Sequence, residues 1–261
     1  MENPQIMTQS TGIGKMDRLA AFLESFKLSA TVITSTDSVE GPCLVLCGAP
    51  DGGESSITLR MPGRGGPSRD LRVTVAIEFD NTTNPLMAAI PNEVTVLLKD
   101  APVLRLTAEA FLSEVEGTRC GRVAALNRLA EVMVLMMLRQ VIDAGVSQPG
   151  LFAALAHPNL HRALVSMHDF PARPWSIEQL ADSAAMSRTQ FMTTFRRLVG
   201  VTPMAYLVAW RLTLARRHLK AGHSVKTVAR RVGFSSAEGF SRSFSRAFGH
   251  PPAAIKETSN A

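Results

Sequence analysis

The chain has 261 residues, of which 46% are hydrophobic and 19% charged, so it can bury a core and is not globally disordered. Its formal net charge of +6 is unevenly distributed. Residues 173–261 hold 14 Lys+Arg and 4 Asp+Glu, whereas residues 1–172 hold 14 Lys+Arg and 18 Asp+Glu. A basic block behind a mildly acidic body indicates a polyanion-binding module joined to a second domain.

The sequence lacks the features of a membrane or secreted protein. No run of about 18 apolar residues is present, so no membrane span is predicted. The N-terminus lacks the basic start and apolar run of a signal peptide. The 3 cysteines, Cys43, Cys47 and Cys120, do not make a disulfide framework, and we therefore expect a cytoplasmic protein.

The predicted elements change in type along the chain. Residues 1–15 are polar and expected to be flexible, and residues 15–28 have the spacing of a short helix. Short β-rich runs separated by turn residues then predict strands at 31–34, 43–48, 56–60, 71–79, 94–98 and 103–106. Strands at this spacing indicate a small barrel or sandwich.

Helices are predicted for the rest of the chain. The helix expected over residues 117–144 has an apolar set too wide for a solvent-facing helix. It should therefore pack on the β body, on a second subunit, or on both. Residues 151–168 form the next expected helix, and the prolines within residues 171–174 indicate a hinge.

The basic block contains an internal repeat. Apolar positions of a short helix recur 48 residues later, and the Phe, Gly and Pro positions of a longer helix recur 49 residues later. The pairs are Ile177 and Val225, Leu180 and Val228, Ala181 and Ala229, Ala184 and Val232, Phe191 and Phe240, Phe195 and Phe244, Gly200 and Gly249, and Pro203 and Pro252. Each unit has the pattern of a helix-turn-helix, and a helix over residues 203–220 joins the two.

The second helix of such a unit enters the DNA major groove, and its first residues reach base edges. Arg188 can pair with guanine and Gln190 with adenine, whereas Arg196 and Arg197 lie where phosphate contact is expected. Glu238 can accept from cytosine. The predicted DNA-contacting set is Ser187, Arg188, Thr189, Gln190, Thr193, Arg196, Arg197, Ser236, Ala237, Glu238, Ser241, Arg242 and Arg246. The alternative is a basic helical bundle with a solvated face.

The basic block resembles the AraC/XylS family of bacterial transcription regulators. The positions that match the family signature are Ala229, Gly233, Phe234, Phe240, Phe244, Phe248, Gly249 and Pro252. The resemblance implies double-stranded promoter DNA and RNA polymerase as partners, usually for activation. It also implies a cupin-type barrel and dimerisation helices in residues 30–150, and hence a homodimer.

These features predict an α+β protein with a small cupin-like β-barrel, dimerisation helices and an all-α domain of two helix-turn-helix units. Residues 1–15 are expected to be a flexible N-terminus and residues 16–150 a ligand-sensing and dimerisation domain. Residues 151–174 are expected to be a connector helix and hinge, and residues 175–261 the DNA-binding domain.

Residues 60–69 combine three arginines with three glycines in the otherwise acidic body. Arginine forks bind phosphate, and glycines let backbone N–H groups approach an anion. Arg60, Arg64, Ser38 and Gly41 resemble the cyclic-di-GMP motifs of PilZ domains, although Thr36 stands where those proteins favour Asp or Asn. This implies a c-di-GMP-responsive regulator of exopolysaccharide genes. The predicted ligand-binding set is Arg60, Arg64, Arg69, Thr36, Ser38 and Gly41, and a solvated loop or another anionic effector are open alternatives.

Catalysis, a cofactor and a metal site are not predicted. All 6 histidines follow the predicted strands, whereas a cupin metal site needs several His or Glu ligands inside the barrel. His157 and His161 are more simply an exposed helix face, and Cys43 and Cys47 leave redox sensing open beside a buried structural role. The predicted function is effector-controlled DNA binding. Sensing of another molecule or of redox state, a cupin-like enzyme with a DNA-binding tail, and an architectural DNA binder are the alternatives.

Overall fold

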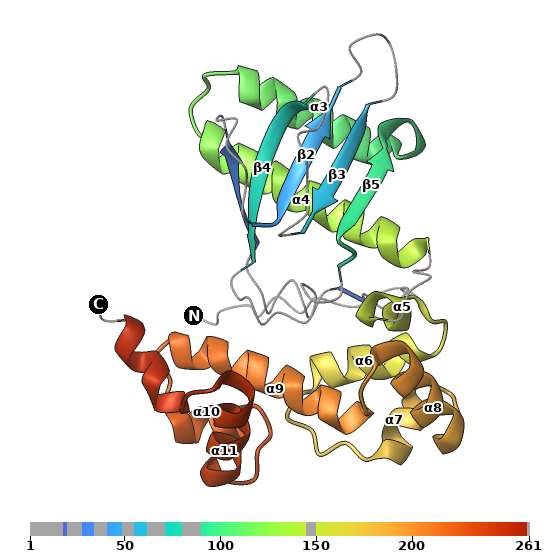
Figure 1. Ribbon diagram of the computed structural model, residues 1–261, viewed down its shortest axis with the longest axis vertical. Coiled ribbons are helices and arrows are strands. Elements are labelled where there is room, and N and C mark those ends of the chain that lie inside the picture. Colours follow the sequence, from blue (N-terminus) through green and yellow to red (C-terminus); the bar gives the residue numbers. More distant parts are fainter. Residues whose placement is uncertain are drawn as a thin grey trace, which may run out of the picture.

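The computed structural model describes residues 18–19, 28–33, 41–48, 55–61, 71–79, 90–144 and 150–259. A β-sheet covered by two helices forms one half of the molecule, and a set of shorter helices forms the other half (Figure 1). The α+β class predicted from the sequence is therefore confirmed.

The described strands form one five-stranded sheet in the order β1-β4-β2-β3-β5. Every neighbouring pair is antiparallel. The strands agree with the sequence prediction to within a few residues at their ends. Their bounds are β1 Leu28–Ile33, β2 Cys43–Cys47, β3 Ser56–Arg60, β4 Leu71–Phe79 and β5 Glu93–Leu97.

Residues of one sheet face pack into a core that two helices cover. Alternation along β2 and β3 sends Leu44, Leu46, Ile57 and Leu59 into this core, where each is at most 3% exposed. The covering helices are α3, Pro102–Glu116, and α4, Arg122–Asp143, which follow the short 3-10 helix η1, Leu98–Asp100 (Figure 1). The opposite face carries Cys43, Thr58 and Arg60 by the same alternation.

The strand predicted at residues 103–106 is wrong, because these residues form the first turns of α3. Pro102 lies at the first helical position, which tolerates its missing N–H. Leu104, Ala108 and Phe111 then recur at helical spacing and are at most 3% exposed. The β-rich composition of a four-residue run is outweighed by this longer helical pattern.

The helix predicted over residues 151–168 is divided into α5, Leu151–Ala156, and α6, Leu160–Asp169. Pro158 lies in the break, where it cannot continue the first helix. His157 Nδ1 accepts hydrogen bonds from the N–H groups of Asn159 and Leu160, at 3.2 and 3.1 Å. The imidazole thus satisfies N–H groups at the start of α6 that have no partner within the helix.

The remaining helices confirm the double repeat. α9 runs across the lower half of Figure 1, with α7 and α8 at one end and α10 and α11 at the other. The bounds are α7 Ile177–Ser183, α8 Arg188–Val199, α9 Pro203–Lys220, α10 Val225–Arg231, α11 Ala237–Phe248 and the 3-10 helix η2 Pro252–Ser259. We call α7–α8 the first unit and α10–α11 the second unit.

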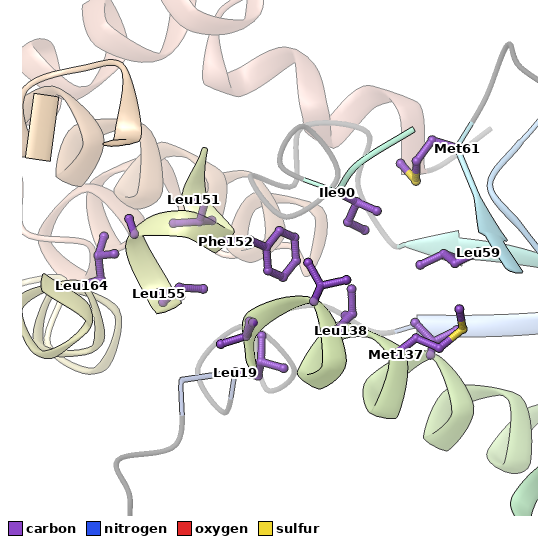
Figure 2. Packing of buried hydrophobic residues seen from close by; sticks show 14 of the residues in the cluster. Leu19, Leu59, Met61, Ile90, Met137, Leu138, Leu151, Phe152, Leu155 and Leu164 are labelled. Carbon is purple, nitrogen blue, oxygen red and sulfur yellow. The ribbon is translucent and has the colours of Figure 1, made fainter. Parts of the chain in front are cut away.

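The buried hydrophobic residues form two cores, and the boundary between these cores lies inside α9. One core extends from the sheet through α4, α5 and α6 to Phe191, Phe195 and Trp210 of the first unit and α9. In Figure 2, Phe152 of α5 lies beside Leu138 at the end of α4. The second core begins at Leu212 and contains the buried residues of the second unit. The first unit therefore shares its core with the sheet domain.

Candidate nucleic-acid interface

The helices α8 and α11 begin with matching serine caps. Ser187 Oγ accepts a hydrogen bond from the N–H of Gln190 at 3.3 Å, and Ser236 Oγ accepts one from the N–H of Gly239 at 3.0 Å. Each cap satisfies one of the N–H groups that lack a partner in the first turn. Both serines were predicted as DNA contacts, and the structure gives their side chains a capping role.

α8 separates its aromatic residues from the predicted DNA contacts. Phe191 and Phe195 are fully buried, with ring centroids 5.6 Å apart. The opposite surface is exposed at every predicted position, namely Ser187, Arg188, Thr189, Gln190, Thr193, Arg196 and Arg197. The i, i+4 spacing of the two phenylalanines thus fixes which side of α8 faces outward.

α11 repeats this arrangement in the second unit. Phe240 and Phe244 are fully buried, with ring centroids 5.5 Å apart. Ser236, Glu238, Arg242 and Arg246 are exposed, whereas Ala237 and Ser241 are partly covered. The predicted contact residues of both units therefore lie on outward surfaces of the second helix.

Arg188 forms an ion pair that the sequence did not predict. Its Nε lies 3.1 Å from Oε1 of Glu178 on α7. The pKa of Glu178 is held below its ordinary value by the backbone N–H of Glu178, the Ser176 hydroxyl and the charge of Arg188. Ser176 and Gln179 form a capping box at the start of α7, and their three-residue spacing was a sequence signal for this helix start that the predictions from the sequence did not use.

The segment 170–175, which precedes the first unit, contacts α9 and the second unit. Arg211 of α9 is buried and donates hydrogen bonds from Nε to the Pro171 carbonyl at 2.6 Å and from Nη2 to the Arg173 carbonyl at 2.8 Å. A side chain at Gly233, in the turn of the second unit, would meet the backbone of Ala172 at 2.6 Å. The segment is thus held by α9 and touches the second unit.

A neutral polar pair lies in the core behind α8. His168 Nε2 and the Tyr206 hydroxyl share a hydrogen bond of 2.7 Å, and the His168 ring packs against Trp210 with centroids 4.6 Å apart. Burial lowers the pKa of His168 to about 3 and raises the pKa of Tyr206. Both groups are therefore uncharged near neutral pH.

Comparison with known proteins assigns both halves of the chain. A model described as a helix-turn-helix domain matches residues 180–258, and one described as a cupin matches residues 17–143. The transcriptional regulator AlkR of Acinetobacter baylyi is 32% identical over 67% of this chain. A Streptomyces lividans protein named as an AraC-like transcription regulator is 34% identical over 56% of this chain. The chain carries an AraC-family helix-turn-helix domain and an N-terminal cupin domain.

The family resemblance stated for the basic block is thereby confirmed, together with the cupin-like N-terminal part. The matches span 59% and 50% of the length of these two relatives. A crystal structure of the DNA-binding domain of AdpA in complex with a target DNA also matches, with 32% sequence identity. The match covers 39% of this chain and 93% of the AdpA chain, with a TM-score of 0.38.

The predicted ligand set of the cupin domain is only partly within the described residues. Thr36, Ser38, Arg64 and Arg69 lie outside them. Arg60 ends β3 opposite Cys43, so Arg60 and Gly41 lie at the same end of the β2–β3 pair. Arg60 Nε lies 3.8 Å from Oε2 of Glu93, and its side chain is 18% exposed. A half-buried arginine is thus present, with one carboxylate beside it.

His157 and His161 were expected on one exposed helix face, but His157 lies in the break between α5 and α6, and both rings bond backbone groups there. The ring of His161 donates from Nδ1 to the His157 carbonyl at 2.9 Å, while His157 Nδ1 accepts at the start of α6. Burial lowers the pKa of His157 and of His161 and raises the pKa of Cys43. No group of three or more His, Cys, Asp or Glu able to hold a metal occurs within the described ranges.

In the part of the chain that the structure describes, no single helix has the length and apolar character needed to cross a membrane. Only α8 and α9 taken together pass the same test, and this pair is bent by 53°.

Proposed function

We propose that this protein is a cytoplasmic transcription regulator that binds promoter DNA through α8 and α11. The observation that carries the proposal is the repeated surface of the AraC-family domain. In both units, the second helix has buried phenylalanines on one side and exposed polar and arginine side chains on the other. The exposed first turns can enter the major groove and reach base edges.

α9 sets the separation of the two DNA-contacting helices. It contains 18 residues, which corresponds to about 27 Å of helix. Successive major-groove segments on one face of DNA are about 34 Å apart. Because the contacts of Arg211 and Gly233 also hold the two units, α8 and α11 meet DNA as one rigid pair.

The test is binding to a duplex selected from a random library, with a shuffled duplex as control. Binding to both should weaken steeply with salt, and the selected duplex should be preferred at physiological salt. Arg188→Ala should cost about 1–3 kcal/mol and relax one base position, whereas Arg196→Ala should weaken all sequences alike. Equal affinity of the wild type for both duplexes would contradict sequence-specific regulation.

We also propose activation through contact with RNA polymerase, which the AraC-family domain supports. Transcription in vitro from a promoter that contains the selected site should rise when the protein is added. A fall in transcript would favour repression.

For the cupin domain we propose binding of a small anionic effector, with cyclic-di-GMP as the first candidate. Arg60, half-buried near Gly41, supports the proposal, because a guanidinium can pair with phosphate or with guanine. The proposed set also includes Arg64, Arg69, Thr36 and Ser38. Glu93 beside Arg60 must then move or accept a donor from the guanine.

Titration calorimetry of the full chain with c-di-GMP tests this proposal. Wild type should bind, Arg60→Ala/Arg64→Ala should not, and Arg105→Ala on exposed α3 should behave as wild type. Absence of wild-type binding would exclude this nucleotide. Equal binding by wild type and the double variant would exclude the assigned site. A rise in melting temperature with another small molecule, or a response of Cys43 and Cys47 to oxidant, would support the alternative effectors.

A homodimer through α3 and α4 completes the proposal. Val103, Leu106 and Val132 are 63%, 60% and 40% exposed, although they are large apolar residues. Thr107 Oγ1 lies 3.8 Å from Met136 Sδ, so these outer surfaces of α3 and α4 adjoin. Leu106→Glu/Val132→Glu should dissociate the dimer in sedimentation experiments. A wild-type monomer at all concentrations would contradict the proposal.

A cupin-like enzyme with a DNA-binding tail is the lower-ranked alternative. Metal analysis of the purified full chain discriminates between the two, because a stoichiometric transition metal would favour the enzyme.

A further inference from the structure

Glu178 and Arg188 connect the two helices of the first unit at their N-terminal ends. Glu178 is at the second helical position of α7, and Arg188 is the first residue of α8. Their side chains are 61% and 70% exposed and meet with Nε and Oε1 3.1 Å apart. A cation at a helix N-terminus is repelled by the helix dipole, and the carboxylate of Glu178 offsets this repulsion.

The start of α7, from which the Glu178 side chain extends, is held by a capping box. Ser176 caps α7 through its Oγ, which accepts from the N–H of Gln179 at 3.2 Å. Gln179 Oε1 accepts from the N–H of Ser176 at 3.1 Å, so the turn is closed from both sides. The Glu178 backbone N–H and the Ser176 hydroxyl lower the pKa of the Glu178 carboxyl, which favours its charged form. The capping box therefore fixes the backbone turn from which a charged Glu178 meets Arg188.

The ion pair uses only Nε of Arg188, so the terminal nitrogens of the guanidinium stay available for a base. A guanidinium has five N–H groups, and four of them are on the two terminal nitrogens. These terminal nitrogens supply the fork that pairs with O6 and N7 of guanine. An arginine without support loses rotamer freedom when it is fixed on a base. Support at Nε removes part of that loss before DNA arrives.

We infer that Glu178 is a positioning residue that holds Arg188 for guanine recognition and so determines specificity at one base pair. The inference rests on the proposed DNA binding by α8. Loss of Glu178 should change base discrimination and overall DNA affinity in different ways, which a merely structural role would not do. Glu178 strengthens discrimination at one base, while its negative charge opposes binding to phosphates of any sequence.

The experiment measures affinities of the full chain for the selected duplex, for duplexes changed at each single base pair, and for shuffled DNA. Glu178→Ala should reduce discrimination at one position by about 1.4- to fivefold, the range for an exposed ion pair. Affinity for shuffled DNA should be unchanged or higher. Glu178→Gln, which keeps an acceptor oxygen, should retain part of the discrimination. Asp182→Asn, on an exposed residue of the same helix, is the charge-matched control and should leave discrimination unchanged.

Arg188→Ala separates failure of the inference from failure of the proposed function. If Glu178 acts through Arg188, adding Glu178→Ala to Arg188→Ala changes nothing further at that base. If Arg188→Ala abolishes the discrimination but Glu178→Ala does not alter it, the role of Glu178 is overturned. If Arg188→Ala leaves every base position unchanged, the proposed reading of bases by Arg188 fails, and the role of Glu178 fails with it.

Discussion

A Cβ atom at Gly233 would lie 2.6 Å from Cα and 2.8 Å from the carbonyl oxygen of Ala172. Gly233 lies in the turn after α10 in the second unit, whereas Ala172 follows α6 and precedes the first unit. The two backbones are therefore in direct contact, and neither can move without disturbing the other. Gly233 also has a φ of +86°, a conformation that favours glycine.

Gly233→Ala should destabilise the protein and weaken DNA binding. The left-handed conformation alone costs about 1–2 kcal/mol, and the collision with Ala172 should add about 1–3 kcal/mol. Gly222→Ala is the matched control, because Gly222 has a φ of +85° and open space at the Cβ position. Denaturant unfolding of both variants measures the difference. Equal destabilisation would mean that the contact with Ala172 contributes nothing.

Arg211→Lys should lower stability although the charge is kept. Lysine has no planar fork, so it cannot bond both the Pro171 and the Arg173 carbonyls in the observed arrangement. We expect a loss of about 1–3 kcal/mol in urea unfolding. Arg128→Lys, at an exposed pair on α4, should change stability little. A neutral Arg211→Lys would show that the segment 170–175 is held by other contacts.

Acid should destabilise the protein through His168. Its pKa is about 3 in the folded state, below the ordinary value of 6.5, so the unfolded chain takes up a proton first. Stability is therefore full above pH 6.5 and falls as the pH falls towards 3. One pH unit below the ordinary value, the loss is about 1.4 kcal/mol. His168→Gln should remove this part of the slope between neutral and acidic pH. An identical slope in wild type and variant would contradict the assignment.

A DNA-binding fragment should need α5 and α6 to fold its first unit. α5 packs on α8, and α6 packs on α7 and α8, within the core that contains Phe191 and Phe195. The fragment 150–261 should show both units as folded in heteronuclear NMR spectra. The fragment 175–261, which begins at the boundary predicted from the sequence, should keep the second unit and lose fixed structure in the first. Well-dispersed signals from both units in the shorter fragment would contradict this.

Local patterns were enough to predict most elements and the outward surfaces of α8 and α11. The repeated Phe pairs at i, i+4 define a buried side, so the opposite side follows from helix geometry. The run at residues 103–106 was misassigned because four β-rich residues carry less information than the helical pattern that follows them.

Contacts between distant residues were not predicted. Glu178 and Arg188, Arg211 and Pro171, and Gly233 and Ala172 meet only through the packing of different helices. A single sequence has periodicity along each helix but no measure of which helices adjoin. The effector site stays a prediction, because most of its residues lie outside the described part of the chain.

The boundary between the two cores lies between Trp210 and Leu212, so α9 fixes the rotation and the distance of the second unit relative to the first. One residue inserted there would turn α11 by about 100° relative to α8 and advance it by about 1.5 Å. If α8 and α11 bind successive major-groove segments as proposed, such a turn would point α11 away from its own segment. Under the proposed function, the spacing of the two half-sites could change only in the discrete steps that whole residues of α9 allow. Substitutions at the exposed positions of α8 and α11 could by contrast alter base preference and leave that spacing unchanged.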